Sequence, residues 1–159
     1  MTLEKELSFT YGYIVENFSR LFSLIDRFNI LSASEDLAEC NFSNIRKKTA
    51  SRMMKNWTKD VSKYFESNIE KTIIAENIKF PDQNVIEIKD FSKRLNDFNN
   101  TEINSYLENI QTELQCHQNN KKILECLTLL KEALIIKQKY LKEFIKYINE
   151  KYPEQSSVS

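Results

Sequence analysis

Apolar residues recur at intervals of three or four along most of the chain, which is the spacing of one face of an α-helix. The most regular stripe in the middle of the chain lies within residues 43–77, and residues 3–28 carry a second, heptad-like stripe. Both segments are predicted to be long helices. Their apolar positions are Met54, Trp57, Val61, Phe65, Ile69 and Ile73 in the first, and Leu3, Leu7, Tyr11, Ile14, Phe18, Leu21, Ile25 and Phe28 in the second.

The second half of the chain shows further helical stripes with two interruptions. In residues 84–114 the triplet Asn99-Asn100-Thr101, followed by Glu102, indicates that one helix stops and another starts. A single bent helix over the same residues is the alternative. The last helix is predicted to begin after Asn120, and its apolar stripe is interrupted at Lys137-Gln138.

Glycine and proline are scarce, with one glycine and two prolines in 159 residues. Because these residues punctuate turns, their scarcity favours a few long helices with short connections. We therefore predict an all-α fold, an antiparallel four-helix-type bundle of three long helices and one split helix. Residues 1–152 are expected to form a single domain, and residues 153–159 a flexible C-terminal tail.

The single glycine, Gly12, falls inside the first predicted helix, where glycine costs about 1 kcal/mol relative to alanine. We expect it to permit the close approach of another helix. A kink at a binding surface is the alternative.

Cysteine usage and hydropathy indicate a soluble, reduced, cytoplasmic protein. The three cysteines, Cys40, Cys116 and Cys126, are an odd number without close spacing, which does not suggest a disulfide framework. The first residues are charged where a signal peptide would be apolar. No apolar run reaches the roughly 18 residues that a membrane span needs, so we expect no membrane interaction.

The side chains offer little for catalysis or for cofactor binding. One histidine cannot supply the two Glu-x-x-His motifs of a di-iron bundle, zinc sites need more Cys and His at short spacing, and one glycine cannot build a phosphate-binding loop. We therefore predict no metal, no cofactor and no enzymatic activity. An enzyme built on Cys116, His117 and distant carboxylates is our third hypothesis, although adjacent residues of a helix point about 100° apart.

Positive charge is concentrated in residues 44–63, which contain seven basic residues and one acidic residue. Five of the cations recur at helical spacing beside the apolar stripe, so they are predicted to form a ridge on one helix face. This basic ridge is our candidate partner-binding site. It consists of Arg46, Lys47, Lys48, Arg52, Lys55, Lys59 and Lys63.

Three explanations of the basic ridge remain open at this point. Acidic segments on either side, which include Glu35, Asp36 and Glu39, make neutralisation by neighbouring helices the simplest one. A partner protein or a phosphate backbone are the others. Trp57 and Tyr64 have apolar spacing, so we expect them in the core and not as base-stacking platforms. A second basic group would enlarge the surface if the second and last helices are adjacent, and a solvated face is the alternative. This group consists of Lys137, Lys139, Lys142 and Lys146.

The function that these features favour is that of a non-enzymatic helical protein-interaction module that uses a charged helix face. Inhibitors, immunity or anti-defence factors and effector-type regulators fit this description. The partner is expected to be another protein. The alternative is a nucleic-acid-binding helical bundle that uses the basic ridge, and no feature of the sequence specifies an oligomeric state.

Overall fold

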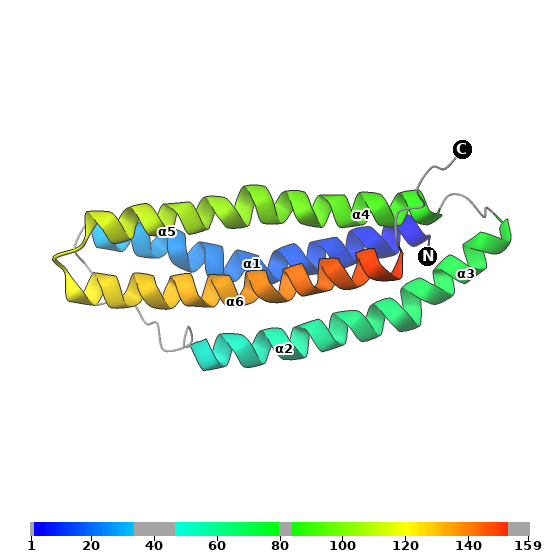
Figure 1. Ribbon diagram of the computed structural model, residues 1–159, viewed down its shortest axis with the longest axis horizontal. Coiled ribbons are helices and arrows are strands. Elements are labelled where there is room, and N and C mark those ends of the chain that lie inside the picture. The colour runs from blue at the N-terminus through cyan, green and yellow to red at the C-terminus, as the bar shows by residue number, and fades with distance from the viewer. Residues whose placement is uncertain (1, 34–46, 80–83, 153–159) are drawn as a thin grey trace.

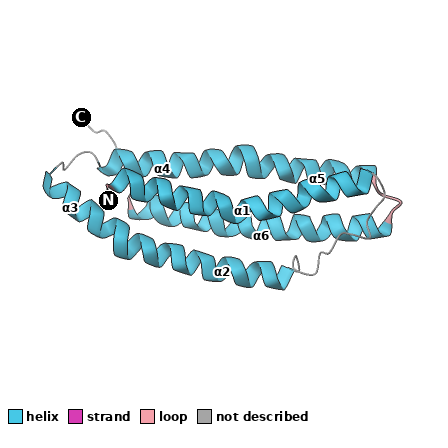
Figure 2. Ribbon diagram, turned by 180° about the vertical axis from the view of Figure 1, so that it is seen from behind, coloured by secondary structure: helices cyan, strands magenta, loops and turns pink. Residues whose placement is uncertain are grey.

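The structure, a computed structural model, describes residues 2–33, 47–79 and 84–152. These residues form four helical rods and no strand, so the predicted all-α bundle is confirmed (Figure 1, Figure 2). Two rods are continuous α-helices, and each of the other two contains one π-helical turn. The elements are α1 (Leu3–Ala33); α2 (Lys47–Tyr64), η3 (Phe65–Ile69) and α3 (Glu70–Lys79); α4 (Asn84–Phe98), η4 (Asn99–Ile103) and α5 (Asn104–Cys116); and α6 (Lys121–Lys151).

Consecutive rods run in opposite directions, but α2 packs mainly against α6, which runs parallel to it (Figure 1). Trp57 of α2 lies edge-on to Phe144 of α6, and farther along both rods Phe65 lies edge-on to Tyr152. In both views α6 lies between α2 and the α4–α5 rod. The rod that carries the basic ridge is therefore attached to the bundle chiefly through α6.

The α1 helix is also parallel to its closest neighbour, the α4–α5 rod. Near the start of α1, the guanidinium of Arg94 lies 4.1 Å from the centre of the Tyr11 ring. Farther along, Phe22 stacks on Tyr106 with 4.1 Å between ring centroids. Together with α6, these two rods enclose the centre of the bundle.

The predicted apolar stripes meet in one continuous core. Every position of the two stripes in residues 3–28 and 54–73 is buried except Tyr11, which is half-buried. Full burial of a large aliphatic or aromatic side chain stabilises the fold by about 1.5–3 kcal/mol. All four rods contribute to this core, so the described residues form one packed unit.

The π turn η4 lies where the spacing of buried residues departs from the α-helical repeat. Phe98 and Ile103 are both buried, yet they are five residues apart. Five residues of an α-helix turn through about 500°, which would leave these two side chains about 140° apart. The wider π turn absorbs one extra residue and brings both onto the core face. The interruption expected at residues 99–101 is therefore a local change of helical pitch, and the rod stays helical throughout.

The other π turn, η3, lies in a run of apolar residues that are always four apart. Each four-residue step overshoots a full helical turn by about 40°, so an unbroken α-helix would carry the last members away from the core. Widening the helix between Phe65 and Ile69 corrects this drift. As a result Trp57 before the turn and Ile73 after it both remain buried.

Gly12 does not serve the purpose expected of it. It is exposed, and a Cβ atom added to it would meet no atom within 4 Å. The prediction that it permits the close approach of another helix is therefore wrong for the described part of the bundle.

Removal of the extra residue of η4 is predicted to be tolerated, whereas removal of a residue from the regular helix that follows is not. Deletion of Asn100, which is exposed in η4, leaves Phe98 and Ile103 four residues apart on one face of an ordinary α-helix. Deletion of Glu108, which is exposed in α5, rotates the following residues by about 100°. That rotation turns Ile110 out of the core and costs roughly 2–5 kcal/mol.

Thermal unfolding followed by circular dichroism measures this difference. The Tm of the Asn100 deletion variant should lie within about 3 °C of the wild-type value, and that of the Glu108 deletion variant should fall by roughly 5–15 °C. Equal losses in the two variants would show that residue spacing does not explain the π turn.

Candidate functional site

The structure places the described side chains of the basic ridge on the outer face of α2. Arg52, Lys55, Lys59 and Lys63 are all exposed, while Met54, Trp57 and Val61 on the opposite face are buried. Lys47 and Lys48 belong to the first turn of α2, and Arg46 lies outside the described residues. The first turn of α2 contains no acidic residue, so the positive end of the helix dipole adds to the potential of the cations.

No carboxylate of the described residues forms an ion pair with Arg52, Lys55, Lys59 or Lys63. Internal neutralisation by the described parts of neighbouring helices therefore does not explain this part of the ridge. The acidic residues Glu35, Asp36 and Glu39, which precede α2 in the chain, lie outside the described residues.

Several carboxylates that could have met the ridge bond tyrosines or a lysine of other rods instead. Glu66 accepts a hydrogen bond from Tyr147 of α6 at 2.9 Å. Glu70 accepts one from Tyr152 and pairs with Lys151, both at the end of α6. These contacts fasten η3 and α3 to α6. The one acidic residue of α2, Asp60, is exposed, and no ion pair joins it to the cations of the ridge.

The same kind of bond joins α2 to α1, where the hydroxyl of Tyr64 donates to the carboxylate of Glu6. Burial, and then the hydrogen bond and the charge of Glu6, raise the pKa of Tyr64 to about 12. The tyrosine therefore stays neutral and keeps donating throughout the physiological range.

The aromatic residues of α2 are turned away from the ridge. Trp57 is only 4% exposed and packs against Phe144, and its indole nitrogen has no hydrogen-bond partner among the described residues. Tyr64 is half-buried and bonded to Glu6. The apolar side chain that does reach solvent on α2 is Met53, which is 55% exposed.

The second basic group does not form one surface, because Lys137 points into the bundle. Its ammonium nitrogen donates to the backbone carbonyl of Asn17 on α1 at 2.7 Å and lies 5.8 Å from the centre of the Phe18 ring. Lys139, Lys142 and Lys146 are exposed on α6, and Lys146 lies 3.9 Å from Glu150. The adjacency of the second and last helices is thus correct, but Lys137 does not enlarge the cationic face.

Burial lowers the pKa of Lys137 to about 8, and the like charge of Arg20 acts in the same direction. An amine in this position is half charged near pH 8, carries its full charge only well below that pH and loses it above. Sequence reasoning placed Lys137 in a solvated group, although the interruption of the apolar stripe at Lys137-Gln138 was a signal that polar groups face the interior.

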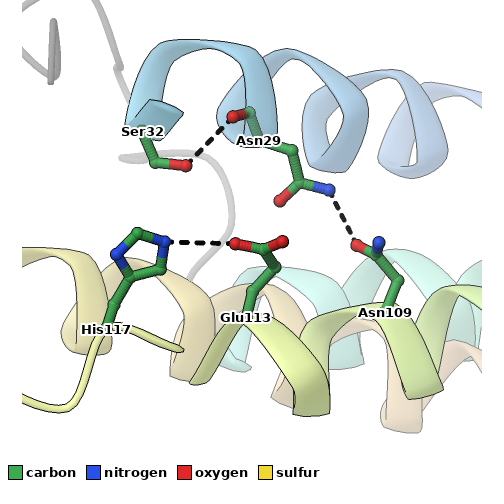
Figure 3. A network of polar contacts seen from close by, with 5 residues as sticks. All are labelled: Asn29, Ser32, Asn109, Glu113 and His117. Atoms are coloured by element: carbon green, nitrogen blue, oxygen red, sulfur yellow. Dashed lines mark hydrogen bonds and ion pairs between the residues drawn. The ribbon is translucent and has the colours of Figure 1, made fainter. Parts of the chain in front are cut away.

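The Cys116–His117 pair is not assembled for nucleophilic catalysis. His117 contacts Glu113 one turn earlier, with 3.1 Å between Nε2 and Oε2, and Figure 3 shows this pair beside a contact between α1 and α5. In that contact Asn29 donates to Asn109 at 2.7 Å. Cys116 is exposed, and no contact joins its sulfur to the imidazole. The imidazole is thus paired with a carboxylate, and the Ser32 hydroxyl, which is drawn beside this pair in Figure 3, donates to the backbone carbonyl of Asn29 at 3.1 Å.

Searches of the described residues for other kinds of site were negative. They contain no group of three or more His, Cys, Asp or Glu side chains arranged to hold a metal ion. Within the same ranges, every helix is too short or too polar to span a membrane.

Comparisons with protein-family models, with curated proteins and with solved structures find no match to this chain. Function is therefore inferred from the chemistry and the placement of the residues alone.

The position of Lys137 predicts a specific dependence of stability on pH. Between pH 8 and about 10.4 the unfolded chain keeps the proton of this lysine, whereas the folded protein releases it. The burial penalty is fully present only well below pH 8 and is relieved as the folded protein loses the proton. The free energy of unfolding should therefore rise with pH in this window, by at most about 1.4 kcal/mol per pH unit.

Urea unfolding at pH 7.5, 8.5 and 9.5 tests this expectation. Lys137→Met should remove the part of the rise that belongs to this amine and should be more stable than the wild type at pH 7.5. Lys139→Met, at an exposed neighbouring position, should retain the wild-type rise. An identical pH dependence in Lys137→Met and the wild type would show that the amine does not titrate in this window.

Proposed function

We propose that this chain is a non-enzymatic protein-interaction module that binds an acidic surface of another protein through the basic ridge of α2. The observation that carries the proposal is the state of Arg52, Lys55, Lys59 and Lys63. They are exposed on one helix face and have no carboxylate partner among the described residues. An inhibitor, an immunity or anti-defence factor, or an effector-type regulator would use such a face.

The architecture suits presentation of a rigid surface. The face of α2 opposite to the ridge is committed to the core through Met54, Trp57 and Val61, so α2 cannot turn its cations inward without exposing these residues. From Arg52 to Lys63 the row extends over about 16 Å at 1.5 Å per residue. A surface of this length matches a few turns of a partner helix.

A protein partner is favoured over single-stranded nucleic acid because no exposed aromatic side chain lies among the described residues of the ridge. Proteins that bind single strands combine cations with aromatic rings on which bases stack, and here Trp57 and Tyr64 are withdrawn from the surface. The exposed neighbour of the cations is Met53. Methionine and arginine are enriched in protein interfaces and lysine is depleted from them, so the lysines suit the rim of an interface around Arg52 and Met53. Complementary charge accelerates association and suppresses wrong partners.

Nucleic acid is the second candidate, and the regular row of cations is the observation that favours it. Cations at helical spacing can follow a phosphate backbone. Binding of that kind releases counterions from the nucleic acid, and it weakens steeply with rising salt because this release becomes less favourable. The two candidates therefore differ in what nuclease treatment and salt do to the complex.

Charge reversal on α2 with a matched reversal on α6 tests the proposal. One variant carries Lys55, Lys59 and Lys63→Glu, and the control carries Lys139, Lys142 and Lys146→Glu. All six lysines are exposed, so both variants should fold with at most a modest change in Tm. Purification of the wild type from its native cells, with and without nuclease, identifies the partner by mass spectrometry.

If the partner is a protein, it should still co-purify with the wild type after nuclease treatment. It should not co-purify with the α2 variant, and it should co-purify with the α6 control. With the purified partner, the α2 variant should associate at least about tenfold more slowly at low salt. Release of the bound material by nuclease would favour the nucleic-acid candidate. Unfolding of the α2 variant alone would mean that the ridge is paired within the chain and is structural.

A further inference from the structure

The interior of the bundle contains a layer of three carboxamide side chains, halfway along α6. Gln138 of α6 is 8% exposed, and its Nε2 atom donates to Asn99 Oδ1 at 2.9 Å and to Asn104 Oδ1 at 2.9 Å. Asn99 is 5% exposed and Asn104 is half-buried. Both hydrogens of the glutamine amide are therefore used, and both acceptors lie on the α4–α5 rod.

This carboxamide layer of Asn99, Asn104 and Gln138 is poorly explained as a source of stability. Withdrawal of amides from water offsets most of what their mutual hydrogen bonds contribute. Replacement of both hydrogen-bonding partners by apolar side chains of similar shape can be nearly neutral or stabilising. A polar group in a core does, however, discriminate strongly between arrangements, because any arrangement that separates the partners leaves buried groups without hydrogen bonds.

The geometry of the layer requires both a π turn and one alignment of the rods. Asn99 begins η4 and Asn104 directly follows it. Five residues apart in an α-helix, the two side chains would point about 140° apart and could not both reach one amide. The π turn brings them to the same side, and they meet Gln138 only when the rod and α6 are at one axial position.

The second π turn provides an internal comparison. The buried polar residues of the described chain are Thr10, Ser32, Ser92, Asn99 and Gln138, and none of them lies in η3. In η3 the apolar residues Phe65 and Ile69 alone face the core. A π turn therefore does not need buried carboxamides. The formation of the π turn does not explain why η4 carries them.

Lys137, the neighbour of Gln138, makes a polar contact with the remaining core rod. It points to α1, where its ammonium nitrogen donates to the carbonyl of Asn17. Two consecutive residues of α6 thus contact two different rods by hydrogen bonds at one level of the bundle.

We infer that Asn99, Asn104 and Gln138 form a register lock, which specifies one axial and rotational alignment of the α4–α5 rod against α6. The apolar stripes of these rods repeat every three or four residues, so a shift by one helical turn would still match apolar side chains with apolar side chains. Such a shift would leave the carboxamides without their partners. The lock therefore selects one packing among several of similar apolar contact, and it is independent of what binds the basic ridge.

A comparison of three variants tests the inference. In the first, Asn99, Asn104 and Gln138→Leu replace the whole layer with apolar side chains. In the second, Gln138→Leu alone removes the hydrogen-bond donor of Asn99 and Asn104. The third is a control with volume-conserving apolar changes in the same rods, Leu95→Met, Ile103→Leu and Leu141→Met, which leave the layer intact.

The triple leucine variant should keep the helical circular dichroism signal and a urea midpoint at or above that of Gln138→Leu, but it should lose its single packing. In ¹H–¹⁵N spectra, amides of α4, α5 and α6 should be doubled or broadened. Their protection from hydrogen exchange should fall at least tenfold relative to the control.

Two results would overturn the inference. One is a triple leucine variant with a single set of sharp amide signals and control-like protection, because the layer would then not select the packing. The other is a triple leucine variant that unfolds while the control folds, because the layer would then act by adding stability.

Discussion

The exposed basic ridge depends on the packing of α2 against α6. Trp57 and Phe65 both meet Phe144 edge-on, with 6.5 and 6.2 Å between ring centroids. Burial of such aromatic side chains is worth more than any surface ion pair, since exposed pairs contribute at most about 1 kcal/mol. The apolar face of α2 therefore decides how the helix lies, and the cations on its other face point to solvent whether or not an acid is near.

A chain with no net charge can in this way expose a strongly cationic face. Along the described rods, several carboxylates accept hydrogen bonds from tyrosine hydroxyls. Tyr64 donates to Glu6, and Tyr106 donates to Asp26 at 2.9 Å. A neutral donor satisfies a carboxylate without cancelling its charge. Among the described residues, these carboxylates are thus not paired with Arg52, Lys55, Lys59 or Lys63, and the positive charge of these side chains faces solvent.

Much of the fold could be predicted from the sequence because the apolar positions repeat with the helical period. Their burial, the inward position of Trp57 and the outward position of Lys55 and Lys59 all follow from that period. The five-residue spacing of Phe98 and Ile103 is also the sequence feature that accompanies the π turn. From the sequence alone, the same spacing is equally consistent with a break between two helices.

Other features depend on which rods become neighbours, and periodicity within one helix cannot specify that. In the sequence, Lys137 has the spacing of a surface lysine. In the folded protein, its ammonium nitrogen lies 2.7 Å from the carbonyl oxygen of Asn17 on α1. Likewise, the carboxamide of Gln138 finds its partners 34 and 39 residues away. The position of the ridge on one face of α2 could be predicted from the helical period. The lack of carboxylate partners among the described residues could not, because it depends on which carboxylates form hydrogen bonds with tyrosines of other rods.

The most direct measurement of whether the ridge is a binding face is lysine labelling at native abundance. Brief acetylation of the protein in an extract of its native cells, and of the purified protein, is quantified at each lysine by mass spectrometry. Lys55, Lys59 and Lys63 should be labelled several-fold less in the extract than in the purified protein, with or without nuclease. Lys139 and Lys142, which are also exposed, should be labelled to the same extent in the extract and in the purified protein. Equal labelling of the two sets in the extract, or protection that nuclease abolishes, would contradict a protein partner on α2.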